Sequence, residues 1–570
     1  MCFLFLGFSL FFLLVKVSSP QSCVKTWREK EKELVIQSCS LPKFPSSKEI
    51  ELNLTFINSQ GNKVSPQEGN FSYEKVTSLD YSHNKISSPD DTSQGFVSVS
   101  QLMLQDNELT VIADGLFEKD GLFEGGKLLY LNLSRNKISS IEDSAFSGLS
   151  NLVSLSLDSN KLTKIELVSP SIPNEELYGG KLAKLTYLNL AHNSIRSVDN
   201  EVFAGLTSLL TLELQGNQLT TVDRQYFVGL EMLSYLNLNG NDIRSIRGAF
   251  DIMAELKKLD LSKNLLSVLD LSRLGPHNKL EFLRLDRNRL SDIPPNLFSE
   301  LKALTFLDLS ENFLVSLEKD LFKDLKNLKH LCLNGNHIHD IPPNLFSGLK
   351  ALTFLDLSKN LLVSLEKDLF KDLKNLKHLC LNGNHIHDIP PNLFSGLKAL
   401  TFLDLSKNLL VSLEKDLFKD LKNLKHLRLD YNSIYYIPSD LFSELKDLTF
   451  LKINNGVGDN AITDIGPKAF PAISPNFIKL QLGKSFSCKA RSDYRNLLKF
   501  TDDFCTLETG TVQSFKTFLK DNSRENEGLT PGLRGQSGEG EISNAGVAVP
   551  ICVQVGVLAL CLLISFLGLY

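Results

Sequence analysis

Leucines recur at a fixed spacing through most of this chain. A 48-residue segment occurs three times in succession, as Asp292–His339, Asp340–His387 and Asp388–Tyr435. The first two copies differ at three positions and the last two at five. Each copy holds two 24-residue units with the pattern L-x-x-L-x-L-x-x-N-x-L. A fixed period in the twenties predicts a solenoid in which each unit is one turn stacked on the next.

The alternation within one unit predicts a short strand. In the run 304–309, the period of two places Leu307 and Leu309 on one side, and Phe306 and Asp308 on the other. One unit cannot bury its own leucines, whereas stacked units pair their strands in parallel and cover each other's leucine layers. Asn312 falls where the chain leaves the strand, where its amide can hydrogen-bond to the turning backbone.

These repeats resemble the extracellular 24-residue class of leucine-rich repeat proteins, with a layout like that of chaoptin, Slit and Toll ectodomains. The resemblance implies an α/β solenoid, a leucine-rich repeat horseshoe with a parallel β-sheet on its concave face. The sequence holds about 15 to 16 repeats, as counted by the repeat Asn. That residue recurs as Asn84, Asn107, Asn136, Asn160, Asn193, Asn217, Asn241, Asn264, Asn288, Asn312, Asn336, Asn360, Asn384, Asn408, Asn432 and Asn460.

The two ends of the chain differ from the repeats. The apolar run from Cys2 to Val15 is too short to span a bilayer and is typical of a secretory signal, with an uncleaved signal anchor as the alternative. The last 26 residues carry no charge and follow a run of small residues. They match a GPI-attachment signal with Ser543 or Asn544 as the attachment residue, and the alternative is a transmembrane helix.

We therefore expect six segments. They are a signal peptide over 1–22, an N-terminal cap with a first degenerate repeat over 23–75, the repeats over 76–470, a C-terminal cap over 471–506, a flexible stalk over 507–544 and a hydrophobic segment over 545–570. The stalk is expected because its composition is polar and rich in Gly and Ser.

Four cysteines flank the repeats. Cys23 and Cys39 precede the first repeat, and Cys488 and Cys505 follow the last. The family resemblance implies one capping disulfide in each pair, and paired cysteines fit an oxidising compartment. The C-terminal segment has two cysteines where the family usually has four beginning C-x-C.

Composition narrows the class of function. A net charge of −5 with 22% charged residues implies no polyanion-binding surface, so we do not expect nucleic acid as a partner. The chain has no Gly-rich phosphate loop, nucleophile elbow or zinc-binding helix motif, and its Asp, Lys and His recur with the repeat. We expect neither enzyme activity nor a cofactor.

The side chains that face away from the leucines form the candidate binding surface. From the ninth repeat on, the residue before the second strand Leu is aromatic or His: Phe282, Phe306, His330, Phe354, His378, Phe402, His426 and Phe450. The residue after that Leu is mostly charged: Arg284, Asp308, Cys332, Asp356, Cys380, Asp404, Arg428 and Lys452. Exposed aromatics beside charges are typical of protein-binding surfaces, so we expect a protein ligand here. In the first half these positions are mostly polar.

Two further features bear on this surface. His330 and Cys332 share one strand face, but the adjacent repeats carry Phe and Asp there, so we expect no metal site and no Cys332–Cys380 disulfide. Glycosylation sequons occur at Asn53, Asn70 and Asn132, all in the first quarter. Asn132 is expected on the concave sheet, which leaves the second half as the better docking surface.

These observations predict a membrane-tethered extracellular repeat protein for cell adhesion or recognition, working at the cell surface through a protein ligand or co-receptor. Two alternatives stay open: an immune receptor for foreign protein or glycan, and a secreted matrix component.

Overall fold

The computed structural model describes residues 77–87, 98–117, 125–142, 144–165, 182–246, 248–269, 279–453, 460–462, 464–466 and 469, with the backbone of a few short strands outside these ranges. By its internal contacts the chain divides into Met1–Lys516 and Thr517–Tyr570, and every described residue lies in the first unit. Within the described ranges, no helix has the length and apolar character needed to cross a bilayer.

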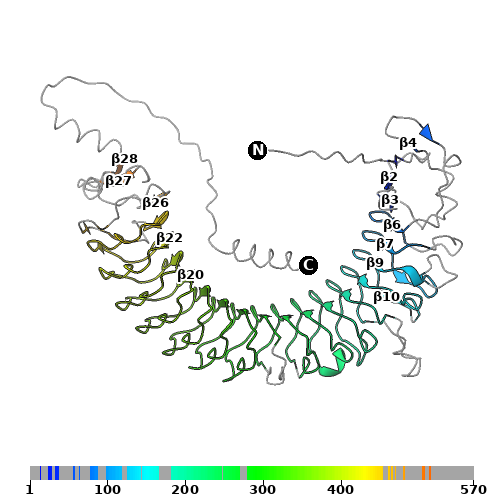
Figure 1. Ribbon diagram of the computed structural model, residues 1–570, viewed down its shortest axis with the longest axis horizontal. Helices are drawn as coiled ribbons and strands as arrows, with labels where there is room; N and C mark the ends of the chain where they lie inside the picture. Colours follow the sequence, from blue (N-terminus) through cyan, green and yellow to red (C-terminus); the bar gives the residue numbers. More distant parts are fainter. Residues whose placement is uncertain are drawn as a thin grey trace. The chain divides into compact units, whose positions relative to one another are not determined.

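One twenty-stranded sheet runs along the repeats, and Figure 1 shows its strands on the inner side of the curved stack. Its parallel strands are β3 (Glu33–Gln37), β6 (Ser78–Asp80), β7 (Gln101–Met103), β9 (Tyr130–Asn132), β11 (Ser154–Ser156), β12 (Tyr187–Asn189), β13 (Thr211–Glu213), β14 (Tyr235–Asn237), β15 (Lys258–Asp260), β16 (Phe282–Arg284), β17 (Phe306–Asp308), β18 (His330–Cys332), β19 (Phe354–Asp356), β20 (His378–Cys380), β21 (Phe402–Asp404), β22 (His426–Arg428), β24 (Phe450–Lys452) and β26 (Lys479–Gln481). At the N-terminal end, β1 (Leu13–Leu14) and β2 (Val24–Arg28) pair antiparallel.

Four two-stranded sheets accompany the main sheet. They pair β8 (Val111–Ile112) with β10 (Ser140–Ile141), β23 (Tyr436–Ile437) with β25 (Asp464–Ile465), β4 (Phe56–Ile57) with β5 (Lys63–Val64), and β27 (Phe504–Thr506) with β28 (Val512–Ser514). The described residues contain two 3-10 helices, η3 (Gly125–Lys127) and η4 (Arg224–Phe227), and no α-helix. In the described residues, the segments that connect consecutive strands of the main sheet are mostly turns. The expected α/β solenoid therefore has turns where α-helices could have stood.

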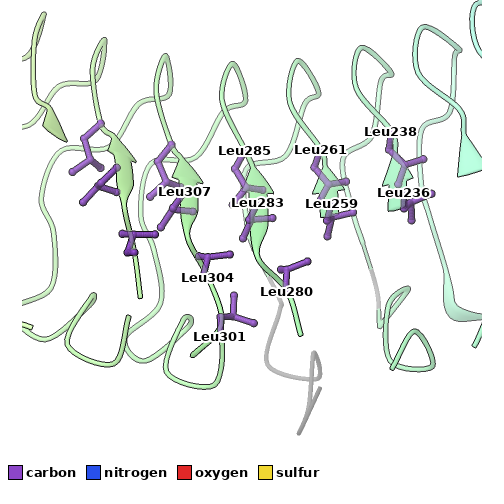
Figure 2. Close-up of a cluster of buried hydrophobic side chains, with 14 of the residues drawn as sticks. Leu236, Leu238, Leu259, Leu261, Leu280, Leu283, Leu285, Leu301, Leu304 and Leu307 are labelled. Atoms are coloured by element: carbon purple, nitrogen blue, oxygen red, sulfur yellow. The ribbon is translucent and has the colours of Figure 1, made fainter. Parts of the chain in front are cut away.

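Leucine layers form the core, as the period predicted. In the main sheet from β6 to β24, the central residue of each strand is buried, and it pairs in register with its equivalents, as Leu283 does with Leu307. Figure 2 shows Leu283 and Leu285 with the equivalent leucines of the neighbouring repeats, Leu259 and Leu261, in parallel rows. Each layer covers its neighbour, so the solenoid buries apolar area that no single turn can bury.

A second buried row lies behind the leucines. Phe298 and Phe322 stack with ring centroids 6.2 Å apart, and Phe394 and Phe418 repeat that contact at the same distance. Aromatic rings bury large areas and gain further from stacking. The Phe near the end of each unit therefore fills the space between the strands and the outer turns.

The repeat Asn ties adjacent turns together. In one repeat, Asn312 Nδ2 donates to the carbonyls of Leu309 (3.1 Å) and Leu285 (2.9 Å), and its Oδ1 accepts from the amide of Leu290 (3.1 Å). All sixteen repeat Asn side chains, from Asn84 to Asn460, are buried. The predicted role is confirmed, and the amide joins two repeats rather than one turn, because buried backbone groups need partners.

Several expectations lie outside the described residues. These are the signal segment, the disulfides of Cys23, Cys39, Cys488 and Cys505, the sequons at Asn53 and Asn70, and the attachment residues Ser543 and Asn544. The segment boundaries stay predictions.

Candidate functional site: the concave face of the second half

Eight rings lie in a row across eight consecutive strands, from β16 to β24. We call this set, Phe282 to Phe450, the ring row. The strands pair in register, with Phe306 opposite His330 and Phe402 opposite His426. Ring centroids are 4.4 Å apart for Phe282 and Phe306, and 5.8 to 6.2 Å apart for each later pair. The predicted aromatic stripe is confirmed as an unbroken row of ring contacts, three of them stacked and four tilted by 32° to 35°.

The rings differ in exposure. His378 and His426 are exposed, Phe306 is buried with 7% of its surface accessible, and the other rings are half-buried. Burial lowers the pKa of His330, His378 and His426, helped for each by a neighbouring lysine and for the first two by the next histidine along the row. The lowered pKa values favour neutral imidazoles. The ring row therefore presents a nearly uncharged aromatic surface at neutral pH.

The acidic residues beside the rings are not exposed, and this expectation is wrong. Asp308, Asp356 and Asp404 keep 8% or less of their surface accessible, and Cys332 and Cys380 are also buried. Strands about 4.8 Å apart on the inside of a curve crowd short side chains against each other. These five residues therefore form a buried floor beside the ring row, and a ligand does not meet them directly.

Each of these aspartates caps the turn that follows its strand. The amide of Ser310 donates to Asp308 Oδ1 (3.0 Å), and those of Ser358 and Ser406 donate to Asp356 and Asp404 (2.9 Å each). An Asp that accepts from the amide two residues on stabilises a turn locally. The D-L-S triplet was the sequence signal for this role.

Two arginines neutralise the ends of the acidic floor. Arg284 lies 3.0 Å from Asp286, 3.6 Å from Asp260 and 4.0 Å from Asp308. At the other end, Arg428 lies 3.4 Å from Asp404 and 2.9 Å from Asp430. Lys452 adds a contact of 3.1 Å to Asp430. The three cations of the predicted set are thus engaged within the chain.

Sequence reasoning missed three members of this network: Asp260, which lies next to Arg284 in the same row, and Asp286 and Asp430, which form a third row. Asp286 and Asp430 each stand two residues after an arginine, in the triplets Arg284-Leu285-Asp286 and Arg428-Leu429-Asp430. Residues two apart on an extended chain lie on the same side. The R-L-D spacing was therefore a readable signal for an ion pair.

Burial dominates the acid–base properties of the floor. It raises the pKa of Asp356 to about 6, against the hydrogen bonds from Ser358. It also raises the pKa of Asp286 to about 7, where repulsion from Asp308 adds to burial and outweighs the attraction of Arg284. Burial is also the main cause that raises the pKa values of Asp308 and Asp404. One arginine cannot neutralise three buried carboxylates.

The first half of the concave face has a different chemistry. Its rings, such as Tyr187 and Tyr235, alternate with Ser154 and Thr211, so no ring stack forms there. Asn237 Nδ2 donates to Glu213 (2.9 Å). Burial raises the pKa of Tyr187 to about 12. Hydrogen-bonded amides and hydroxyls take the place of rings and ion pairs.

Asn132 lies on β9 as predicted, half-exposed on the concave side, and its Oδ1 accepts from the amide of Ser134 (3.0 Å). Its glycosylation stays a prediction. Cys332 and Cys380 lie on β18 and β20, and β19 lies between them in the sheet. Among the described residues, no group of three or more His, Cys, Asp or Glu side chains is placed to hold a metal ion.

Stacked parallel strands, leucine layers and a buried Asn in every turn define a leucine-rich solenoid. The family model described as leucine rich repeat matches residues 97–162, 183–243, 254–313, 278–338, 304–362, 355–410 and 403–455. These segments cover more than half of the chain. The protein belongs to the leucine-rich repeat family.

Two relatives show how far the likeness extends. Human leucine-rich repeats and immunoglobulin-like domains protein 1 is 32% identical over 136 residues, which cover 24% of this chain and 11% of the relative. Rabbit (Oryctolagus cuniculus) lumican is 34% identical over 126 residues, which cover 22% of this chain and 62% of lumican. The match therefore spans less than two thirds of either relative.

The fold is also similar to that of Toll in its complex with Spatzle, from Drosophila. The TM-score is 0.59 at 23% identity, and the match covers 72% of this chain and 51% of the Toll chain. At this identity the likeness concerns the fold.

Proposed function

We propose that this chain is an extracellular, membrane-tethered leucine-rich repeat protein that binds a protein ligand in cell adhesion or recognition. The ligand docks on the ring row. The observation that supports this proposal most directly is the unbroken row of eight rings. The rings are neutral, and the exposed His378 and His426 suit contact with the side chains of another protein. Aromatic side chains are enriched among the residues that dominate binding energy at protein interfaces.

The two arginines that are ion-paired within the chain indicate how a ligand would meet this surface. Arg284 and Arg428 bind aspartates of their own chain, so they fix the floor rather than reach for a ligand. A surface held in place by its own contacts loses little conformational entropy on binding. The ligand therefore meets a rigid aromatic strip with an arginine near each end.

The extracellular placement rests on the apolar terminal segments, the sequons and the relatedness to lumican. The family's fold is that of a protein-interaction scaffold, and the structure of Toll with Spatzle holds a partner on such a fold. Tethering to a membrane, through residues 545–570, is part of the proposal.

The test is a binding screen with the full chain displayed on cells, against purified secreted proteins, cell-surface proteins and microbial surfaces. For a partner found in this way, His378→Glu is expected to weaken binding at least tenfold, because it places a charge in the middle of the neutral ring row. The matched control is Tyr130→Glu, which changes the equivalent strand position in the first half, where Tyr130 is 42% exposed.

The two variants give opposite results if the ligand uses the first half. Loss of binding in the Tyr130 variant with full binding in the His378 variant would overturn the site. Release of the chain from cells by a GPI-cleaving phospholipase tests the anchor separately, so the anchor and the site can fail independently.

A further inference from the structure

A second surface of the same repeats carries exposed apolar side chains. After each repeat Asn the chain leaves the concave sheet and runs along the side of the curved stack. In the repeats from Asn312 to Asn408 the residues one and three positions after the Asn are exposed, apart from the half-buried Leu361, while the residue between them is buried, as Leu314 is. We call these positions, in the five repeats from Asn312 to Asn408, the flank stripe. Its apolar members are Phe313, Val315, Leu361, Val363, Leu409 and Val411.

Five of these six side chains are well exposed, and Leu361 is half-buried. The accessible fraction is 50% for Phe313, 47% for Val315, 49% for Val363, 39% for Leu409 and 44% for Val411. Single exposed apolar residues are ordinary on a protein surface, but a contiguous set indicates an interaction site. In the flank stripe, histidine rows join the apolar rows into one surface, as where the His337 ring stacks on Phe313.

Hydrogen bonds hold the stripe in register. The amide of His337 donates to the Leu314 carbonyl, and the amide of Leu361 donates to the Ile338 carbonyl, both at 2.9 Å. The rings of Phe313 and His337 stack with centroids 5.8 Å apart. The rows of the stripe therefore lie side by side at the spacing of the repeats.

The rest of the solenoid lacks this feature. In the nine preceding repeats, from Asn84 to Asn288, the same two positions hold polar residues in every case but Leu265. Ser433 follows the stripe at its other end, beside Tyr435. The fold does not require apolar residues here, since eight of these nine repeats form without them.

The five rows alternate in composition. Apolar pairs occupy the first, third and fifth rows, and the histidine pairs His337 with His339 and His385 with His387 occupy the second and fourth. An alternation over an odd number of rows reads the same in both directions. Duplication of the 48-residue segment has therefore produced a stripe that is complementary to a reversed copy of itself.

We propose that the flank stripe is a self-association surface on which a second copy of this chain packs in the opposite direction. The two copies are related by a two-fold axis that lies in the contact plane and crosses the stripe at Leu361 and Val363. The row of Phe313 then faces the row of Leu409 in the other copy, and the two inner histidine rows face each other. A two-fold contact of this kind uses the same patch on both subunits.

The curvature of the stack selects this axis. Figure 1 shows that the repeats follow an arc, so a stripe along its side is also curved. A two-fold axis along the stripe would make the two arcs bend in opposite directions and diverge. The axis across the stripe superposes one arc on the other and keeps all five rows in contact.

Charges at the edge of the stripe favour the same register. The residue before the repeat Asn is Glu311 in the first row and Lys407 in the fifth. Glu311 accepts two hydrogen bonds from Arg287 of its own chain, and reversal places this carboxylate beside Lys407 of the other copy, twice in the dimer. Lys359 lies near the axis, and its side chain leans over Gly383, where an added Cβ would lie 3.5 Å from Lys359 Cγ. This leaves room for the second Lys359.

The size of the contact is adequate. Three positions in five repeats give about 15 side chains, and residues beside them bring the total close to the roughly 20 to 30 that each partner contributes to a standard interface. The concave ring row stays open in this dimer. Self-association is thus independent of the proposed ligand.

Cysteine crosslinking in the full chain tests the register. A thiol crosslinker with a reach of about two strand spacings is expected to join two copies of the Val363→Cys variant, because this residue lies on the axis. Phe313→Cys alone gives no product, since its two copies lie about 19 Å apart, four strand spacings of about 4.8 Å. A mixture of the Phe313→Cys and Leu409→Cys chains gives the crosslinked pair.

The wild-type chain, with its own nine cysteines, reports the background. Crosslinking of Phe313→Cys with itself would overturn the antiparallel register. Crosslinking of the three variants to a different protein, or to nothing, would overturn self-association.

Sedimentation equilibrium of the full chain gives a second measurement. Val363→Glu puts two carboxylates at the axis and is expected to weaken the dimer at least tenfold. The control is Met232→Glu, because Met232 is equally exposed at 49% but lies in another repeat, outside the stripe. A wild-type chain that sediments as a monomer at micromolar concentration, or a Met232 variant that loses the dimer equally, would contradict the proposal.

Discussion

Tyr187 in the first half and Phe354 in the second occupy the same position on equivalent strands, with different neighbours. Ser154 and Thr211 flank Tyr187, whereas the rings of His330 and His378 lie on either side of Phe354 with centroids 5.9 and 6.1 Å away. The same contrast holds on the flank, where nine largely polar repeats precede the alternating stripe. Leucine layers and Asn hydrogen bonds continue unchanged through both halves. The framework is therefore independent of the surfaces it carries, and three substitutions test this separation.

The largest effect is expected for the repeat Asn, equally in both halves. Asn217 in the first half and Asn360 in the second each donate to two backbone carbonyls and accept from one amide. Substitution by Ala leaves these buried groups unsatisfied and should cost about 3 to 5 kcal/mol of unfolding free energy at either site. Urea unfolding, with hydrogen exchange of the flanking repeats, measures the loss.

Asn375→Ala is the control for that experiment. The Asn375 side chain is exposed and donates to the Lys350 carbonyl at 2.9 Å, so its loss should cost less than about 1 kcal/mol. A loss of under 1 kcal/mol at Asn217 or Asn360 would mean that one half is held together differently from the other.

The second effect concerns the ion pairs between the arginines and the buried aspartates of the second-half floor. The last 48-residue copy has Arg428 and Asp430 where the middle copy has Cys380 and Asn382. Arg428→Cys alone leaves Asp430, which is 0% exposed, with Lys452 as its remaining cation, and should cost about 3 kcal/mol. Arg428→Cys with Asp430→Asn recreates the middle copy and should return stability to within about 1 kcal/mol of the wild type.

Thermal unfolding of both variants and the wild type measures this coupling. Equal losses in the single and the double variant would show that Arg428 acts through packing rather than through charge.

The framework could be predicted from the sequence because each framework residue meets a single structural requirement. Leu307 is buried and Asn312 is hydrogen-bonded wherever turns of this length stack, so their spacing determines their environment. The surface residues obey several requirements at once. Alternation places Asp356 on the solvent side, but the curvature of the sheet and the turn after the strand enclose it. No period in a single sequence expresses that crowding between neighbouring turns.

The ring row was predictable for a related reason. Residues at equivalent positions of adjacent strands lie close together, so a run of Phe and His at one position produces a row of ring contacts. Predicting the ion pair of Arg284 with Asp286 required attention to a third position, two residues after the arginine. Only the R-L-D triplet indicated that contact. The flank stripe required a comparison between repeats at positions that are exposed in most repeats.

The smallest effect is expected at Asp356 and depends on pH. Burial raises its pKa to about 6, above the ordinary value of 3.8 that it regains on unfolding. Between about pH 4 and pH 6 the folded chain therefore binds a proton that the unfolded chain has released, so stability falls as the pH rises through this window. Above it, the buried carboxylate destabilises the fold. Asp356→Asn keeps the oxygen that accepts from the Ser358 amide and removes the charge.

At pH 7.5 this variant should gain about 1 to 2 kcal/mol over the wild type, and at pH 4 the two should be equally stable. The histidines of the ring row, whose pKa values are lowered, act in the opposite direction but are common to both chains, so the difference between them isolates Asp356. Met103→Leu, at the equivalent first-half position on β7, should leave the pH dependence unchanged because it exchanges one uncharged side chain for another. Denaturant unfolding at pH 4, 5, 6 and 7.5 gives the comparison. A variant that is less stable than the wild type at pH 7.5 would show that the carboxylate stabilises its turn by more than burial costs.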